Sequence, residues 1–159
     1  MAVSQLQPLL KGMGMAERRF LYGLDRTPDD RLNWSPGGEA KTPLAVAGRL
    51  SGFLGFFSHL LETGAMPERP ASLPPPPENR EAAKSAVEAA FRRLVTLLEG
   101  MREADLTRPL PTPWGTSIPA LEMLGWINGI TGYWQGQLNY IQTIYGDVDP
   151  NMPPGWGQE

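Results

Sequence analysis

The sequence is poor in the side chains that most often carry out chemistry. Its 159 residues include no Cys and a single His, His59. Without Cys there can be no disulfide, no thiolate nucleophile and no Cys-based metal site. A lone His cannot supply the three ligands that a catalytic zinc ion needs. On a helical wheel His59 lies opposite the apolar stripe of its predicted helix, which indicates a side chain that points to solvent.

Charged residues are also few, and their signs nearly balance. Fourteen Lys and Arg oppose 17 Asp and Glu, giving a net charge of -3. A nucleic-acid-binding surface needs a basic stripe, so nucleic acid is not an expected partner. No apolar run approaches the ~20 residues that span a bilayer, and the N-terminus lacks the pattern of a secretory signal. We therefore expect a cytoplasmic protein with no membrane partner and no cofactor.

Proline and glycine are abundant and clustered, with 17 Pro and 18 Gly. They separate four segments in which apolar residues recur at helical spacing. The four predicted helices cover about residues 4–24, 43–64, 79–101 and 117–145. The run Pro74 to Pro77 cannot be helical and predicts an extended polyproline strap between the second and third helices. A second interpretation makes that run a peptide ligand for another protein.

Several predicted helix ends carry the residues that usually form them. Thr42 is a good N-cap and Pro43 suits the first position of the second helix. Gly64 is a plausible C-cap for the same helix. Asn79 is a candidate cap for the third helix, and Gly146 ends the fourth. These signals make the segment boundaries specific.

The segments together predict the fold class. Strand alternation and internal repeats are both missing, and four helices of about 20 residues with apolar stripes are typical of a four-helix bundle. The prediction is an all-α protein with a longer Pro-rich crossover between helices two and three. Residues 1–146 would form the bundle, and residues 147–159 a tail that is packed on it or frayed.

Three segments resemble the DinB-like (DinB/YfiT) superfamily of four-helix bundles. They are DDRLNWSPGG at 29–38, TPLAVAGRL at 42–50 and YWQGQL at 133–138. They occur in the family's order and spacing over nearly the whole chain. The resemblance implies the same bundle fold, in a group that includes metal-dependent proteins and thiol-dependent transferases.

Many members of that superfamily hold a divalent metal by three His, one on the second helix and two on the fourth. The matching positions here are Arg49, Ile130 and Trp134. An arginine stays cationic and has no free lone pair, and isoleucine and tryptophan offer no suitable donor atom. We therefore predict that the chain has lost the family's metal site.

Two interpretations of Arg49 remain open. In the first, it is a structural plug, whose stem is packed and whose guanidinium is satisfied by loop carbonyls. Alternatively it forms a small pocket for an anionic or carboxylate-bearing ligand, held by charge-assisted hydrogen bonds. The resemblance implies that Arg49 and Trp134 come together near one end of the bundle, where the guanidinium could stack on the indole. The candidate ligand-binding residues are Arg49, Trp134, Gln137, Trp34, Asn33, Ile130 and Phe53.

The sequence favours a non-catalytic protein that binds a small ligand or a protein partner at the bundle mouth. No catalytic residue can be named, because no Ser/His/Asp, Cys/His or phosphate-loop arrangement is present. The alternative is a thiol-dependent S-transferase-like enzyme with a metal-independent site, in which Arg49 acts electrostatically. A purely structural or stress-response interaction protein is a third hypothesis.

A second surface on the fourth helix predicts self-association. Trp126, Tyr133, Tyr140 and Ile144 lie on one flank of that helix, away from its core-facing stripe. Aromatic side chains are enriched at protein interfaces, and a stripe along one helix suits a two-fold axis. We therefore expect a homodimer.

Overall fold

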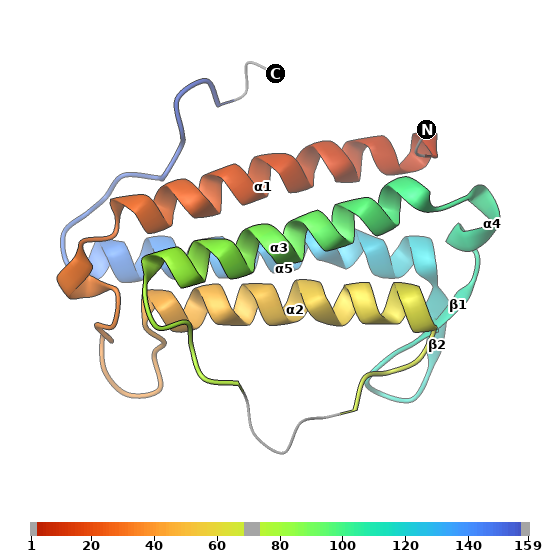
Figure 1. Ribbon diagram of the computed structural model, residues 1–159, viewed down its shortest axis with the longest axis horizontal. Coiled ribbons are helices and arrows are strands. Elements are labelled where there is room, and N and C mark those ends of the chain that lie inside the picture. Colours follow the sequence, from red (N-terminus) through yellow and green to blue (C-terminus); the bar gives the residue numbers. More distant parts are fainter. Residues whose placement is uncertain (1–2, 69–73, 157–159) are drawn as a thin grey trace.

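The computed structural model describes residues 3–68 and 74–156 (Figure 1). Its four long helices are α1 (Gln7–Arg26), α2 (Pro43–Thr63), α3 (Arg80–Gly100) and α5 (Ala120–Ile144). The shorter elements are η1 (Ser4–Leu6), η2 (Asp29–Arg31), α4 (Glu103–Leu106), β1 (Pro109–Pro111) and β2 (Ser117–Pro119). The four long helices pack as a bundle, which confirms the predicted fold class.

The crossover between α2 and α3 is also confirmed. Both α1 and α2 pack against α3 and α5, so α1 and α2 lie diagonally opposite. Neighbouring helices α2 and α3 run in the same direction (Figure 1), so the chain has to come back to the end at which α2 begins before α3 starts. A 21-residue helix is about 31 Å long, which is the distance that this connection has to cover. Pro76 and Pro77 lie against α2 at Gly48, where a Cβ would come 3.1 Å from Pro77 Cδ.

The ends of α2 and α3 form as their sequences predict. Thr42 Oγ1 accepts a hydrogen bond from the Ala45 amide at 3.2 Å, and Asn79 Oδ1 accepts one from the Ala82 amide at 2.9 Å. Gly64 adopts the left-handed conformation, with φ of 70°. These bonds satisfy terminal amides that have no partner inside the helix. Helix boundaries of this kind are therefore local properties of the sequence.

The start of α5 corrects the sequence prediction, and so does the segment before it. Residues 107–116 were expected to be a loop and Ser117 to begin the helix, but β1 and β2 form an antiparallel pair and α5 begins at Ala120. Because a residue before proline is disfavoured in the α region, Ile118 stays extended ahead of Pro119. Leu110 in β1 is 1% exposed and anchors the hairpin to the bundle. Strands of three residues are too short to show alternation.

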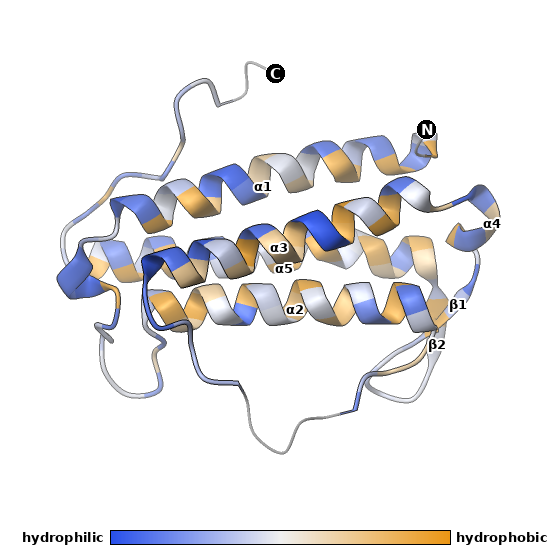
Figure 2. Cartoon of the chain, viewed as in Figure 1, coloured by the Kyte–Doolittle hydropathy of each residue, from blue (hydrophilic) through white to orange (hydrophobic). Residues whose placement is uncertain are grey.

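The core lies between the four long helices, whose apolar stripes face inward (Figure 2). Among the described helices only α2 is long and apolar enough to cross a membrane by length and composition, and half of that stretch is buried inside the bundle. Leu50, Leu54 and Leu60 of α2 are each at most 1% exposed. Burial in the bundle therefore accounts for the apolar residues of α2 that face the core.

Arg80 ties the start of α3 to the end of α1. Its guanidinium donates to the carbonyl oxygens of Leu24, of Asp25 at 2.9 Å and of Thr27 at 2.7 Å. It also forms an ion pair with Asp29 at 2.5 Å. The last carbonyls of a helix lack partners within it, so a cation placed there both satisfies them and complements the helix dipole. This contact holds the end of the bundle at which the chain turns from α1 toward α2.

Candidate functional site

Trp134 lies at the contact between α5 and α2. Its ring packs against Phe53 of α2 at 5.7 Å between centroids and against Tyr133 at 4.9 Å. The side chain is 5% exposed, yet its buried Nε1 has no hydrogen-bond partner in the described part of the chain. A buried indole N–H usually finds an acceptor. The Trp134 N–H is therefore a donor that residues 3–68 and 74–156 leave unsatisfied.

Arg49 precedes Phe53 by one turn of α2, and residues four apart lie on the same side of a helix. Its side chain is half-buried. Within residues 3–68 and 74–156 no hydrogen bond, ion pair or ring contact involves Arg49. Among the described residues, no loop carbonyl accepts a hydrogen bond from it, as a structural plug would require. Arg49 and Trp134 thus contribute two donors that have no acceptor.

The expected stack of Arg49 on the Trp134 indole is not formed. The cation–π contacts among the described residues involve Arg19, Arg26 and Arg31 instead. The position of the site also differs from the expectation, because Phe53 is midway along α2 and Trp134 is close to the middle of α5. The contact therefore lies on the flank of the bundle between these helices and not at its mouth.

Trp34 takes part in a different cluster. Its ring lies 6.0 Å from that of Tyr145, edge to face, and the Arg31 guanidinium lies 5.3 Å from the Trp34 ring and 5.6 Å from the Tyr145 ring. Burial raises the pKa of the Tyr145 hydroxyl. Asn33, between the two loop residues, is exposed. The sequence analysis missed Arg31 and Tyr145, because a loop of polar and aromatic residues does not indicate which of them face the same helix end.

Gln137 lines an open groove of about 600 Å³ between α5 and the loop of residues 36–41. Gly132 and Gly136 contribute their backbone to it, and Tyr133 and Tyr140 line it as well. Ile130, by contrast, is half-buried and packs against the core. The structure therefore brings Phe53 and Trp134 together and assigns Gln137 to a neighbouring groove. Sequence reasoning missed Lys41, a half-buried cation at this groove.

The side chains of Arg49, Ile130 and Trp134 do not suit a metal ion as ligands. A guanidinium, an aliphatic chain and an indole offer no lone pair to a divalent cation. Across the part of the chain that is described, no group of three or more His, Cys, Asp or Glu could hold one either. His59 is half-buried on α2 and not fully exposed as expected.

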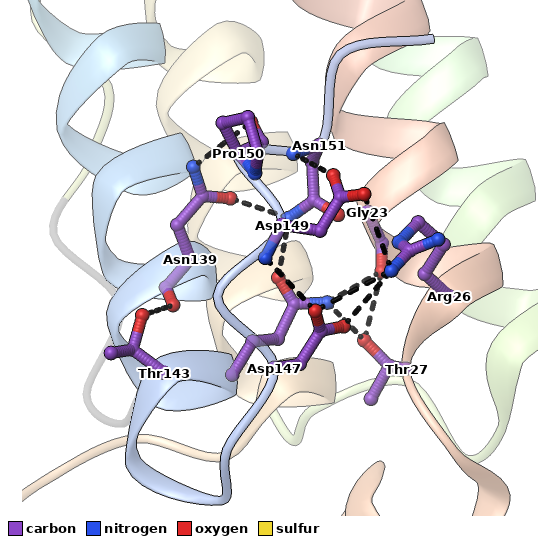
Figure 3. Close-up of polar contacts among 10 residues, drawn as sticks. Gly23, Arg26, Thr27, Asn139, Thr143, Asp147, Asp149, Pro150 and Asn151 are labelled. Carbon is purple, nitrogen blue, oxygen red and sulfur yellow. Dashed lines mark hydrogen bonds and ion pairs between the residues drawn. The ribbon is translucent and has the colours of Figure 1, made fainter.

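A network of amide side chains fastens the C-terminal segment across α1 and α5 (Figure 3). Gln142 Nε2 donates to the Gly23 carbonyl oxygen at 3.0 Å and to Thr27 Oγ1 at 3.2 Å. Asn151 is fully buried, and its Nδ2 donates to Asn139 Oδ1 at 2.6 Å and to Gln142 Oε1 at 2.5 Å. These interactions satisfy several polar groups beneath the tail and have no counterpart in the sequence prediction.

Two acidic residues of the same segment add an ionic contact to this network. Arg26, at the end of α1, lies 3.4 Å from the carboxylates of both Asp147 and Asp149. Asp147 also accepts the Asp149 amide and Asp149 accepts the Asn151 amide. Asp147, Asp149 and Asn151 recur at every second position, and this spacing was the sequence signal that could have predicted an ordered turn. The network is a structural clasp on the far side of α5 from the groove.

The four-helix bundle of this chain is similar in fold to solved structures of two other proteins. One solved structure that it matches is the DinB-like protein YjoA from Bacillus subtilis, with a TM-score of 0.68 and 11% identity over 90% of this chain and 95% of that one. Another is the mycothiol-dependent maleylpyruvate isomerase, with a TM-score of 0.63 and 17% identity over 92% of this chain and 65% of that one. At such identities the likeness concerns the fold. No protein-family model and no curated protein matches the sequence.

Proposed function

We propose that the protein binds a small carboxylate-bearing ligand between α2 and α5, without a metal ion. The observation that supports this is the pair of unsatisfied donors, the half-buried Arg49 guanidinium and the buried Trp134 Nε1. A carboxylate has two oxygens and can accept from both donors, and charge-assisted hydrogen bonds are among the strongest that a protein makes. Neither donor has an acceptor among the described residues, and a ligand that reaches the buried Trp134 N–H would supply one.

The surroundings favour a ligand with an apolar body. Phe53 packs on Trp134 but remains 41% exposed, so its ring offers apolar surface beside the two donors. A hydrogen bond to a charged group contributes about 1.5–3 kcal/mol. Loss of either donor should therefore weaken binding by roughly 10- to 100-fold.

The test compares ligand-induced changes in melting temperature and calorimetric affinities across a panel of mono- and dicarboxylates and inorganic phosphate. Trp134→Phe keeps the ring and removes the N–H, and Arg49→Gln removes the charge. Arg92→Gln, an exposed site on α3, is the matched control. We expect a carboxylate to stabilise the native protein and the control equally, and the two site variants much less.

The plug hypothesis makes the opposite prediction for the same variants. If no carboxylate or phosphate changes the melting temperature while Arg49→Gln lowers that of the ligand-free protein, Arg49 is structural and the binding proposal is wrong. If Arg49→Gln leaves the ligand-free protein unchanged and abolishes carboxylate binding, the plug hypothesis is wrong.

The alternative function is a metal-independent, thiol-dependent transfer reaction at the same place. The likeness in fold to a mycothiol-dependent isomerase favours it. Arg49 would then bind the anionic group of a thiol adduct and stabilise developing negative charge. Incubating the purified protein with mycothiol and maleylpyruvate tests this, because turnover that Arg49→Gln abolishes would favour an enzyme over a binding protein.

A further inference from the structure

The groove between α5 and the loop of residues 36–41 has polar side chains without partners. It encloses about 600 Å³, which is within the range of about 300–1,000 Å³ for ligand pockets. Glu39, Lys41 and Gln137 line it, and the remaining lining is mostly apolar. Within residues 3–68 and 74–156 none of these three side chains forms a hydrogen bond or an ion pair. The groove therefore offers a carboxylate, an ammonium and an amide to a ligand.

The loop that carries the two charges is held by its own hydrogen bonds. Ser35 Oγ donates to the Ala40 carbonyl oxygen at 2.8 Å and accepts the Gly37 amide at 3.2 Å. The Ala40 amide donates to the Gly37 carbonyl oxygen at 3.1 Å, and Gly37 has a φ of 115°, which favours glycine. Glu39 and Lys41, on either side of Ala40, are thus held at the groove before a ligand binds. Such preorganisation reduces the entropy that binding costs.

The wall that α5 contributes is bare backbone between two tyrosines. Gly132 and Gly136 line the groove one turn apart, and a Cβ added at either would meet nothing within 4 Å. Glycine weakens a helix relative to alanine, and no contact among the described residues requires it at these positions. Tyr133 and Tyr140, about one turn before and after Gly136, are 60% and 69% exposed. Because glycine permits close approach to the backbone, a flat ring can lie over Gly136 between the two tyrosines.

The two charges of the groove restrict the class of ligand. A carboxylate suits Lys41, and an ammonium suits Glu39. A ligand with only a carboxylate would place its negative charge near Glu39, and one with only an amine would place its positive charge near Lys41. The two residues are separated by Ala40 alone, so both ligand charges have to lie close together. The α-ammonium and α-carboxylate of an amino acid meet this condition.

We propose that the groove binds the zwitterion of an aromatic amino acid. The ligand carboxylate pairs with Lys41 and its ammonium pairs with Glu39. Its ring lies over Gly136 between the two exposed tyrosines, where aromatic pairs contribute beyond their buried area. Gln137, half-buried in the same wall, donates its amide N–H to the carboxylate. Charge and shape therefore select the ligand together.

Calorimetric and NMR titrations test the ligand class. The probes are L-phenylalanine, L-tyrosine and L-tryptophan, each added separately. Phenylpropionate lacks the ammonium, phenethylamine lacks the carboxylate, and glycine lacks the ring. We expect at least one aromatic amino acid to bind at least about tenfold more tightly than each incomplete probe, because each lost interaction weakens binding by about that factor. No binding of any aromatic amino acid up to about 10 mM, or equal binding of an incomplete probe, would overturn the proposal.

Arg49→Gln separates the groove from the carboxylate site proposed above. Neither Arg49 nor Trp134 lines the groove, so the variant should bind the aromatic amino acid as tightly as the native protein does. The comparison with phenylpropionate is made in this variant, where the other carboxylate site no longer contributes. Loss of amino-acid binding in Arg49→Gln would place the ligand at that other site and would refute the groove.

Substitutions in the groove test the position of the ligand. Gly136→Leu should raise the dissociation constant at least about tenfold without lowering the melting temperature, because the space there is open. Gly125→Leu, at an equally open glycine of α5 outside the groove, is the matched control and should bind normally. Lys41→Gln and Glu39→Gln should each weaken binding about tenfold. Equal binding by the two leucine variants would contradict the proposed position.

Light scattering on the same leucine variants tests the other possible occupant, a second copy of the chain. A particle mass that falls from twice 17.5 kDa to 17.5 kDa in Gly136→Leu but not in Gly125→Leu would mean that protein covers the groove, and the amino-acid proposal would then be wrong. We expect the two variants to have the same mass as the native protein.

Discussion

Arg80 and Arg49 carry the same guanidinium in opposite surroundings. Arg80 donates to three carbonyl oxygens of the α1 end and to Asp29. Arg49 is half-buried and has no such partner among the residues that the structure describes. A charged group with all its hydrogen bonds made stabilises the fold, whereas one with none is available to a ligand. The partners therefore distinguish a structural arginine from a candidate binding residue.

Glu17 gives a prediction about pH at the residue scale. Burial raises the pKa of its carboxyl above the ordinary value, Glu88 raises it further, and Arg92 lowers it in part. A group whose pKa is higher in the folded state stabilises the protein below its unfolded pKa, and this contribution is lost as pH rises through the folded pKa. The ionised Glu17 is therefore unfavourable at neutral pH.

Glu17→Gln should accordingly stabilise the protein at pH 7, and the gain should disappear below about pH 4, where the native carboxyl is protonated. Urea unfolding at pH 7 and pH 3.5 measures both values. Because the side chain is partly exposed, the gain at pH 7 should be only a fraction of a kcal/mol. An equal gain at both pH values would show that charge is not its cause.

The elements of the bundle depend on two kinds of signal. Caps such as Thr42 and Asn79 act within one turn, so α2 and α3 begin where their sequences predict. The clasp of the C-terminal segment depends instead on close approach between α1 and α5. At Gly23 a Cβ would lie 3.0 Å from Leu138 Cδ2 and 3.3 Å from Asn151 Nδ2. A Cβ at Gly23 would therefore crowd the side chains of both α5 and the tail.

Gly23→Ala should destabilise the protein by about 1–3 kcal/mol, because the Leu138 methyl and the amide of the buried Asn151 have to shift by a few tenths of an ångström. Gly14→Ala on the same helix is the matched control, since a Cβ there meets nothing within 4 Å. The Gly14→Ala variant should gain up to about 1 kcal/mol in free energy of unfolding, because alanine has a higher helix propensity than glycine. Urea unfolding compares the two, and limited proteolysis should release the tail faster in Gly23→Ala only. Similar effects of both substitutions would contradict the role of the clasp.

At the scale of the whole molecule, the parallel arrangement of α2 and α3 makes the strap between them part of the fold. The chain must return along the bundle before α3 can pack, and Pro76 and Pro77 lie on α2 at Gly48. Proline restricts the unfolded chain and favours an extended backbone, so it reduces the entropy lost on closing this connection.

Replacing Pro74 to Pro77 by glycines should lower the free energy of unfolding by roughly 2–4 kcal/mol, at about 0.4–1 kcal/mol for each proline removed. Changing Pro153 and Pro154 in the tail, outside any connection between helices, is the control and should have a smaller effect per residue. Urea denaturation measures the difference in the free energy of unfolding, provided that the slope of this free energy against urea concentration is the same in all variants. A loss per proline that is the same at both places would show that the strap has no special role.

The sequence by itself determined the four long helices and the caps of α2 and α3, because each depends on the chemistry of side chains within a few residues. It allowed a crossover between α2 and α3, but the direction of the helices was decided only by their packing. It could not predict that Ile118 and Leu110 would pair as strands, that Arg31 would stack on Trp34 and Tyr145, or that Asn151 would be buried. Those outcomes depend on which helices pack against each other and on their relative positions along the bundle axis. Helical periodicity identifies the buried face of each helix, whereas only packing of all four determines which side chains meet, and so which donors remain without an acceptor.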